Sequence, residues 1–288
     1  MQEKAQTELV TYSVDEAGVA NLVLNRPDQR NAQNAELLYQ LNECFDRAAR
    51  DNDVRVVVLS GAGPDFSTGH DLKSSQEEMA EAAKKRPSLS GWTDFEAPGA
   101  AGFYAIEQEI FLGFTKRWRN FPKPTIAAVQ GNCIAAGLML AWACDIIIAS
   151  DDARFSDPVV SFGMPGVEWF AHPYELGPRK AKEFLFTSDR WNAQEAHRLG
   201  MVNHVVPAAE LQPFVQQMAR KIATKPPFAL KLAKEAVNRA EDMGGKTMSI
   251  DAFFSLHHLS HQHNNVMFGT LMDPTGAPKM TRQKPRGS

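Results

Sequence analysis

The sequence predicts an α/β fold with a helical region at its C-terminal end, and three observations lead to this expectation. Short β-branched and apolar runs, bounded by turn residues, lie mainly in the first half of the chain. Segments with helical spacing of their apolar residues alternate with them. Beyond Pro173 the pattern is almost entirely helical. This order is typical of an α/β core followed by a helical cap.

The expected elements follow in chain order. Leu9–Val14 and Val19–Leu24 alternate in polarity around a turn at Asp15–Gly18, which predicts a β-hairpin. Further strands are expected at Val54–Leu59, Pro124–Val129, Asp145–Ala149 and Val202–Val206. Helices are expected at Glu36–Arg50, Leu72–Lys85, Phe103–Arg119 and Ala136–Ala143. We divide the chain into a core at 1–206, a C-terminal helical region at 207–272 and a loose tail at 273–288.

The composition of the 288 residues, 43% hydrophobic and 23% charged, is that of a chain able to bury a full core. The net charge of −3 and the lack of a polybasic run argue against binding to nucleic acid or to a membrane surface. The N-terminus has no signal-peptide pattern, and no apolar run is long enough to span a bilayer. Three cysteines without motif spacing indicate free thiols in a reducing compartment. We expect a soluble, cytoplasmic protein.

Two turns, each following a predicted buried strand, carry the chemistry. The first is Asp65–Leu72, which contains Gly69, and the second is Gln130–Leu138, which contains Gly137. Each lets a ligand approach the backbone, and each is expected to open a helix with free N–H groups at its start. Two such donors aimed at one oxygen form an oxyanion hole, where a lost donor costs about 3 kcal/mol of transition-state stabilisation. Either turn alone would be read as an ordinary strand-to-helix turn, and neither has a Walker or dinucleotide fingerprint.

Further segments extend this pattern along the chain. They are Asn25-Arg26-Pro27 with Asn31-Ala32, the turn Phe66–Leu72, the block Pro124–Gly137 with Cys144-Asp145, then Gly163–Gly166 and Leu199–Asn203. In this order they resemble the crotonase, or enoyl-CoA hydratase/isomerase, family, from about residue 9 to about residue 242. Each motif is weak by itself, but so many in the family's order make the resemblance specific.

The resemblance implies a crotonase-like spiral of ββα units with a C-terminal helical region that forms trimers. The assembly would be a homotrimer or a hexamer built as a dimer of trimers, and the ligand a coenzyme A thioester. By motif match, the backbone N–H groups of His70 and Ala136 are the oxyanion donors. Substrate and CoA contacts are expected at Arg30, Ala32, Thr68, Asp71, Leu72, Gly137 and Val159. No metal is expected, and no cofactor other than the coenzyme A of the substrate.

The glutamate pair with which the family's hydratases activate water is missing here. Met139 stands at the first of these positions and Val159 at the second, and neither can transfer a proton. Glu168 is the expected replacement, because apolar neighbours would raise its pKa toward neutrality and suit it to proton transfer. The structural alternative is a surface glutamate, or one paired with Arg179 or Lys180.

Four other titratable groups have structural interpretations. Asp71 is expected to cap the helix after the first turn, and Asp145 to close a turn. Asp157 is a second candidate acid, although a carboxylate before a proline is as typical of a turn. His172 is a third candidate, with a structural hydrogen bond as its more common role.

Two features remain outside these motifs. His257, His258, His261 and His263 form the densest titratable cluster, and two of them, four residues apart, share a helix face as metal ligands can. Because no acidic residue or cysteine lies at matching spacing, a polar interface face is favoured over a metal site. The long segment Ser74–Gly102 is either a lid over the acyl chain or a decoration of the trimer surface.

We therefore expect an acyl-CoA-binding lyase or isomerase of fatty acid metabolism that stabilises a thioester enolate at His70 and Ala136. Glu168 would move the protons. Two alternatives stay open. The absence of the glutamate pair favours a catalytically silent acyl-CoA-binding protein, and the same oxyanion hole would serve a thioester hydrolase or decarboxylase.

Overall fold

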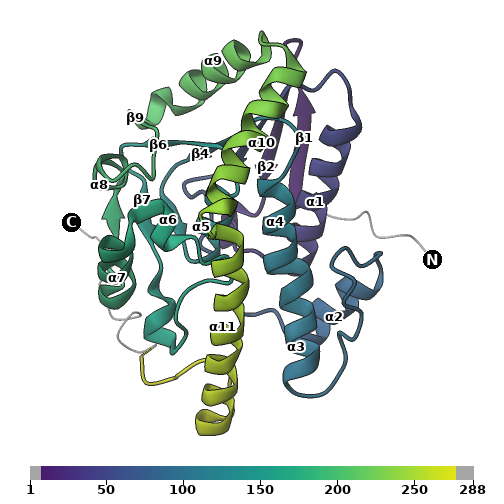
Figure 1. The fold of residues 1–288 in the computed structure, drawn as a ribbon, viewed down its shortest axis with the longest axis vertical. Coiled ribbons are helices and arrows are strands. Elements are labelled where there is room, and N and C mark those ends of the chain that lie inside the picture. The colour runs from purple at the N-terminus through teal and green to yellow at the C-terminus, as the bar shows by residue number, and fades with distance from the viewer. Residues whose placement is uncertain (1–7, 277–288) are drawn as a thin grey trace.

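The computed structural model describes residues 8–276, which form two sheets surrounded by helices (Figure 1). The larger sheet has the strand order β1-β2-β3-β4-β6-β9. Its strands are β1 (Val10–Val14), β2 (Val19–Leu24), β3 (Val56–Gly61), β4 (Thr125–Val129), β6 (Ile146–Ser150) and β9 (His204–Val206). β1 and β2 form the expected antiparallel hairpin, and the remaining neighbours pair in parallel.

A second sheet was not expected from the sequence. It consists of β5 (Asn132–Ile134), β7 (Arg154–Ser156) and β8 (Trp191–Asn192). These strands have only two or three residues each, too few to show a period in the sequence. The parallel pairing of β5 with β7 holds the second glycine-bearing turn in place.

Helices connect and cover the strands, as the alternating pattern predicts. They are α1 (Ala35–Arg50), α2 (Gln76–Lys84), α3 (Ala100–Glu107), α4 (Phe114–Arg119), α5 (Ala136–Trp142), α6 (His172–Leu176), α7 (Pro178–Thr187), α8 (Ala193–Arg198), α9 (Leu211–Ala223), α10 (Pro227–Met243) and α11 (Lys246–Phe268). A π-helical stretch, Gln108–Gly113, joins α3 to α4, so the expected helix at 103–119 is present but changes its winding. The mixed α/β class with a helical C-terminal region is confirmed.

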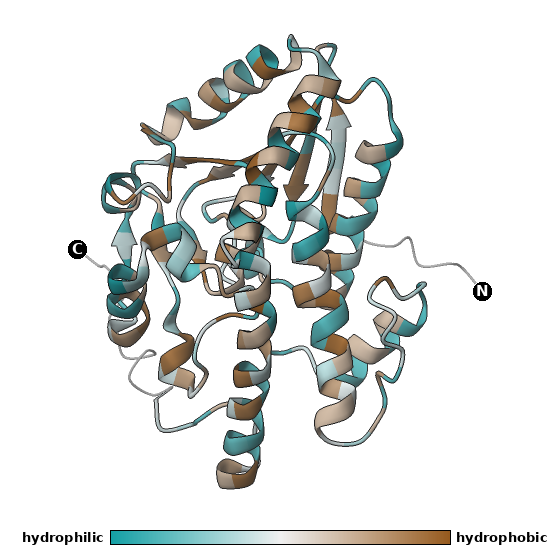
Figure 2. Cartoon of the chain, in the orientation of Figure 1, coloured by the Kyte–Doolittle hydropathy of each residue, from teal (hydrophilic) through white to brown (hydrophobic). Residues whose placement is uncertain are grey.

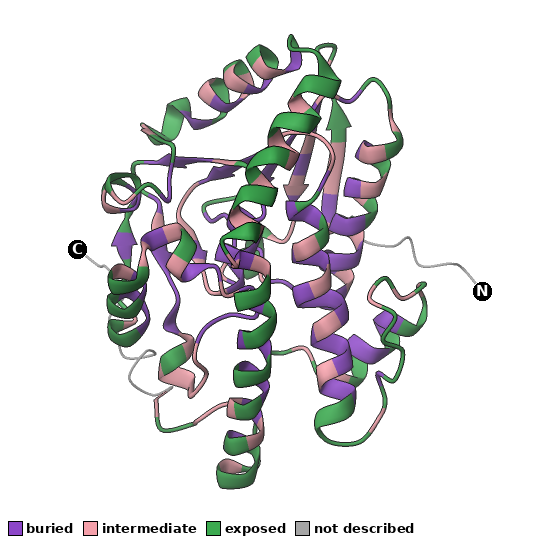
Figure 3. Ribbon diagram, in the orientation of Figure 1, coloured by how far each residue is buried: buried purple, intermediate pink, exposed green. Residues whose placement is uncertain are grey.

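The two faces of the large sheet bury different helices. In β3, Val57 and Leu59 belong to the same core as α1, whereas Val56 and Val58 pack with Val215 of α9. Side chains alternate between the two faces of a strand, so one apolar run supplies both cores. Figure 2 shows β4 and β6 as largely hydrophobic, and Figure 3 shows these central strands buried, whereas the edge strand β1 is partly exposed. Helix α9, which we assign to the C-terminal region, thus covers the sheet, and the proposed domain boundaries stay a prediction.

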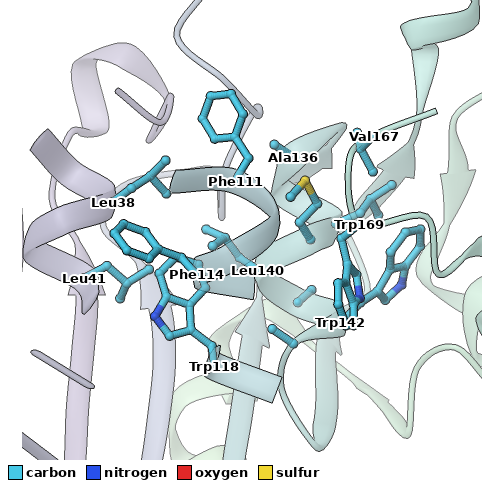
Figure 4. Packing of buried hydrophobic residues seen from close by; sticks show 14 of the residues in the cluster. Leu38, Leu41, Phe111, Phe114, Trp118, Ala136, Leu140, Trp142, Val167 and Trp169 are labelled. Carbon is cyan, nitrogen blue, oxygen red and sulfur yellow. The ribbon is translucent and has the colours of Figure 1, made fainter. Parts of the chain in front are cut away.

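The main core lies between α1, α4 and α5. Figure 4 shows Leu38 and Leu41 of α1 beside Phe114 and Trp118 of α4. The rings of Phe45 and Trp118 are stacked with their centroids 5.7 Å apart. Each fully buried leucine or phenylalanine contributes about 1.5–3 kcal/mol to folding, so this core can fix the position of α5 and of the turn that precedes it.

The helix expected at Leu72–Lys85 begins later than predicted, at Gln76. Ser75 is its N-cap and forms a capping box with Glu78, which is a stronger start signal than the single carboxylate of Asp71. Asp71 instead pairs with Arg26 at 2.9 Å. The predicted capping role of Asp71, and the helix dipole expected at the first turn, are therefore wrong.

Helix α10 has no buried residue in the single chain, and much of its surface is exposed in Figure 3. Within residues 8–276 we find no helix with the length and apolar character needed to cross a membrane. Cys44, Cys133 and Cys144 are all free thiols, as expected. The proposed tail at 273–288 lies mostly outside the described residues.

Candidate functional site

The two glycine-bearing turns lie side by side. Ser67 and Cys133 form a parallel bridge in which the N–H of Ser67 donates to the carbonyl of Asn132 and the N–H of Ile134 donates to the carbonyl of Ser67, both at 3.0 Å. A Cβ atom on Gly137 would lie 2.4 Å from the same Ser67 oxygen. The second turn therefore approaches the first as closely as backbone atoms permit, and only glycine allows this contact.

His70 and Ala136, the predicted donors, have N–H groups that no hydrogen bond uses within the part of the chain that the structure describes. Gly69, at φ +90°, precedes the first of them, and a Cβ on it would lie 3.1 Å from the Ala136 nitrogen. The two N–H groups thus belong to adjacent backbone segments. Both donors are therefore available to a ligand, and their sharing of one oxygen stays a prediction.

Ala135 carries backbone strain immediately before the second donor. Its φ of 50° and ψ of −120° lie outside the regions that residues with a side chain favour. The N–H of Ala135 donates to the carbonyl of Ser156 at 2.9 Å, and its carbonyl accepts from Leu138. Strain of this kind costs about 1–3 kcal/mol and clusters at functional sites. Here it turns the chain so that α5 begins at Ala136, as predicted.

The residues expected to contact coenzyme A lie along one edge of the first turn. The N–H of Thr68 donates to the carbonyl of Arg30 at 3.1 Å, and the N–H of Asp71 donates to the carbonyl of Gln33 at 2.9 Å. Ala32 lies between these two contacts. The side chain of Arg30 is 69% exposed, and its Nε lies 3.8 Å from Oδ2 of Asp65. Leu72, also in this set, projects into solvent.

Glu168 is buried, and its Oε2 lies 3.2 Å from Nε2 of His70. The alternative pairing with Lys180 is wrong, because Lys180 pairs with Glu183. Burial would raise the pKa of Glu168, but the charge and hydrogen bond of His70 outweigh burial and lower it. The expected rise toward neutrality is therefore wrong, since the sequence shows the apolar neighbours and not the histidine from a distant turn. The structure favours an ionised carboxylate.

The side chain of His70 has a role that the sequence did not reveal. Its ring stacks on Phe111 of the π-helical stretch, with centroids 3.8 Å apart, while its Nε2 faces Glu168. His70 thus contributes a free backbone N–H and a side chain that holds the nearby carboxylate.

Met139 and Val159, the positions at which the resemblance leads us to expect the hydratase glutamates, have apolar side chains that pack in the structure. Met139 is 2% exposed in the core, and Val159 packs at its edge. Asp157 caps the turn that follows it and accepts from Nε2 of His172 at 2.8 Å, with both side chains fully buried. Asp145 accepts from the N–H of Thr125, as a structural carboxylate would. Glu168 is thus the acidic candidate that contacts the side chain of His70.

The histidine cluster faces inward, so its expected place on an interface face is wrong for three of its four members. His257, His258 and His261 are buried, whereas His263 is exposed. They surround Glu107, the last residue of α3, which the sequence did not single out. Sequence spacing missed this carboxylate because it comes from another helix.

The segment Ser74–Gly102 is anchored to the π-helical stretch. The buried carboxylate of Glu109 accepts from the backbone N–H groups of Leu89 and Ser90, at 2.8 and 2.7 Å. Within the segment, the side chain of Phe95 is buried, whereas Trp92 is exposed. Whether it serves as a lid or as part of a subunit surface stays a prediction.

Known proteins are similar to this chain in sequence and in fold. The profile of the family described as enoyl-CoA hydratase/isomerase matches residues 15–97 and 90–272. The chain belongs to the enoyl-CoA hydratase/isomerase family. EchA13 of Mycobacterium tuberculosis is 45% identical over 264 residues, which cover 89% of this chain and 81% of that protein.

Two further relatives extend the comparison. The 1,2-epoxyphenylacetyl-CoA isomerase of Escherichia coli is 34% identical over 227 residues, covering 78% of this chain and 79% of the relative. The crystal structure of a probable enoyl-CoA hydratase from Mycobacterium smegmatis superposes with a TM-score of 0.80 at 44% identity, covering 93% of this chain and 100% of that chain. Membership of the crotonase superfamily, expected from the motifs, is confirmed, and the chain is an enzyme of the enoyl-CoA hydratase/isomerase type.

Proposed function

We propose that this enzyme binds an acyl-CoA thioester and stabilises its enolate at the backbone N–H groups of His70 and Ala136. The observation that carries the proposal is the pair of free donors on two adjacent turns. Negative charge develops on the thioester oxygen as the enolate forms, and preorganised donors stabilise that charge more than the neutral carbonyl. The names of relatives that act on CoA esters support this choice of substrate.

Glu168 is the proposed proton-transfer group. Its carboxylate removes a proton from the thioester Cα, and the electrons of the C–H bond move into the carbonyl to give the enolate. The hydrogen bond from His70 holds the carboxylate beside the donor turn. Met139 and Val159 leave no glutamate pair to activate water, so the proposed chemistry passes through the enolate without that pair.

Coenzyme A would run along the edge formed by Arg30, Ala32, Thr68, Asp71 and Leu72. The exposed guanidinium of Arg30 supplies a positive charge suited to a phosphate. Gly137 and Val159 would lie toward the acyl end. No cofactor is proposed beyond the coenzyme A of the substrate.

The assembly we propose is a homotrimer or a hexamer built through α10 and α11. These helices expose large apolar side chains, among them Phe228, Met243, Met248 and Val266. Exposed apolar patches of this kind mark contact surfaces. The three free cysteines suit a reducing, cytoplasmic compartment.

The test is the exchange of the Cα proton in deuterium oxide, which reports enolate formation whatever reaction follows. The wild-type chain should incorporate deuterium into one or more saturated acyl-CoA esters, measured by mass spectrometry. Glu168→Gln should slow this exchange by about 10²–10⁴-fold, the usual contribution of a general base. Glu183→Gln, on the exposed side of α7, is the matched control and should exchange at the wild-type rate.

The same experiment separates the alternatives. Unchanged exchange in Glu168→Gln would remove this residue from the mechanism. Binding of acyl-CoA esters with no exchange and no turnover would favour the silent acyl-CoA-binding protein, which the loss of the glutamate pair also suggests. Release of free coenzyme A or of carbon dioxide would favour the hydrolase or decarboxylase.

A further inference from the structure

Three histidines of α11 converge on one carboxylate inside the protein. The side chains of His257, His258 and His261 are 3%, 8% and 5% exposed, and that of Glu107 is 2% exposed. Helices α3 and α11 contact each other, which brings Glu107 to the histidines. This cluster lies next to the proposed active site, because Oε1 of Glu168 is 3.6 Å from Nε2 of His257.

The hydrogen bonds at the Nδ1 atoms determine which ring nitrogens carry protons. Nδ1 of His257 lies 2.9 Å from the carbonyl oxygen of Gly166, and Nδ1 of His261 lies 3.0 Å from that of Leu271. A carbonyl oxygen can only accept, so each Nδ1 must carry the hydrogen. In the neutral ring, Nε2 is then left with a lone pair and no hydrogen.

These two Nε2 atoms face each other at 2.9 Å. Two lone pairs at that distance repel each other unless a cation lies between or beside them. The carboxylate of Glu107 adds negative charge, with its oxygens 3.5 Å from Nε2 of His261 and 3.7 Å from Nε2 of His257. Oε2 of Glu107 is buried without a hydrogen-bond partner within the described part of the chain. A cation at the centre of this group would be stabilised by both lone pairs and by the carboxylate.

We propose that His257, His261 and Glu107 bind a divalent transition-metal ion, for which Zn²⁺ is the representative. One ligand atom from each of the three residues lies within 4.8 Å of the others. Two histidines and one glutamate are a common ligand set for zinc with an open position. With Zn–N bonds of about 2.0–2.1 Å, tetrahedral geometry separates the two nitrogens by about 3.3 Å. The rings need to move apart only slightly.

The surroundings resemble the outer shell of a metal site. Histidines that bind metals commonly donate their other N–H to a backbone carbonyl, as His257 and His261 do. Nε2 of His258 lies 2.9 Å from Oε2 of Glu107, without the alignment of a hydrogen bond, and can hold that carboxylate in place. The rings of Phe103, Tyr104 and Phe254 pack around His258 and limit the access of water.

A single proton on one ring is the competing explanation for the short contact. The pKa of His261 agrees with this explanation. Burial would lower that pKa, but the hydrogen bond and charge of Glu107 raise it overall. We favour the metal because the Nε2 atoms of both histidines and the carboxylate of Glu107 converge on one point, and one proton shared by two of these three groups leaves the third without a partner there. The sequence led us to expect no metal, because no carboxylate lies at matching spacing. The tertiary structure supplies that carboxylate from another helix, and we therefore propose a metal site.

The test is a titration of the chelator-treated full-length protein with ZnCl₂ in competition with a chromophoric chelator. One equivalent of zinc per chain should bind. His257→Gln and His261→Gln should each weaken binding by more than about a hundredfold, and His258→Gln by about ten- to a hundredfold, as for an outer-shell residue. His263→Gln, on the exposed side of the same helix, is the matched control and should bind zinc normally.

A second measurement keeps the proposal falsifiable if a variant does not fold. Wild-type protein loaded with Co²⁺ should show the visible absorption of a nitrogen- and oxygen-ligated ion, and one equivalent of Zn²⁺ should abolish it. Substoichiometric binding, or equal binding in folded His257→Gln and His261→Gln, would mean an adventitious ion only and would overturn the proposal. The exchange assay on Cα is separate, because its outcome decides the role of Glu168 and not that of the metal ligands.

Discussion

The two halves of the site are built in different ways. The donor half consists of backbone groups at His70 and Ala136, held by hydrogen bonds between segments that extend buried strands. The acidic half consists of side chains, Glu168 and the Glu107–histidine cluster, that come from the loop after β7 and from two helices. The first half depends on backbone geometry, and the second depends on charge.

This difference predicts how each half tolerates change. A backbone N–H donor does not depend on which side chain its residue carries, so the histidine at position 70 leaves the N–H free. A buried carboxylate is tolerated only together with its partners, because an unpaired charge in the interior lowers the free energy of unfolding. Substitutions can therefore damage one half while the other stays intact, and three predictions use this separation.

The largest effect is expected for Glu107→Gln in the chelator-treated protein. Loss of the charge leaves the buried histidines without their carboxylate, and breaking such a buried pair costs about 3–5 kcal/mol of unfolding free energy. Urea denaturation measures this loss. The exposed pair of Glu235 with Arg239 provides the control, and Glu235→Gln should change stability by less than about 1 kcal/mol.

An intermediate effect is expected for Gly69→Ala. At φ +90° a side chain costs about 1–2 kcal/mol, and the new Cβ would lie 2.9 Å from the Ile134 oxygen and 3.1 Å from the Ala136 nitrogen. We expect a total loss of about 2–4 kcal/mol and slower Cα exchange, with zinc binding preserved. Denaturation, exchange and zinc titration on one preparation would show whether the two halves separate.

The matched control for this change is Gly91→Ala. Gly91 has a similar φ of +79°, but its Cβ would meet no atom within 4 Å. Only the conformational cost of about 1–2 kcal/mol should remain, with normal exchange. Equal losses in both variants would show that the approach of Gly69 to the second turn has no special importance.

The smallest effect is expected for Met139→Leu. Met139 is buried, and a swap that conserves volume usually costs less than about 1.5 kcal/mol. Exchange should stay within about twofold of wild type if Met139 serves only to pack. A large fall in exchange with normal stability would give this side chain a direct role in the acyl pocket.

Much of the fold follows from local pattern. The hairpin, the buried strands at β3, β4 and β6, and the helices α1 and α5 all lie within a few residues of their predicted bounds. The hairpin and α1 have a clear period of apolar residues, and the others are short apolar runs bounded by turn residues. The start of α2 was misplaced, since the Ser75 capping box competes with Asp71. The small second sheet was missed because its strands are too short to show a period.

The candidate site divides in the same way. The turns of His70 and Ala136 have sequence signatures, and their role as oxyanion donors stays a prediction, while the pKa shift expected for the carboxylate was wrong. Glu168 was identified, but the direction of its pKa shift depends on His70, 98 residues away in the chain. Glu107 was missed because no local pattern marks a partner on another helix.

The sequence by itself determined the class of fold, the order of its elements and the two turns that carry free N–H groups, because these depend on local periodicity and on glycine. Only the tertiary structure decided the charges around them. In the tertiary structure Asp71 pairs with Arg26, His70 contacts Glu168, and three histidines of α11 surround Glu107. Electrostatic interactions depend on distance in space and on burial, and these are decided when segments far apart in the chain come together.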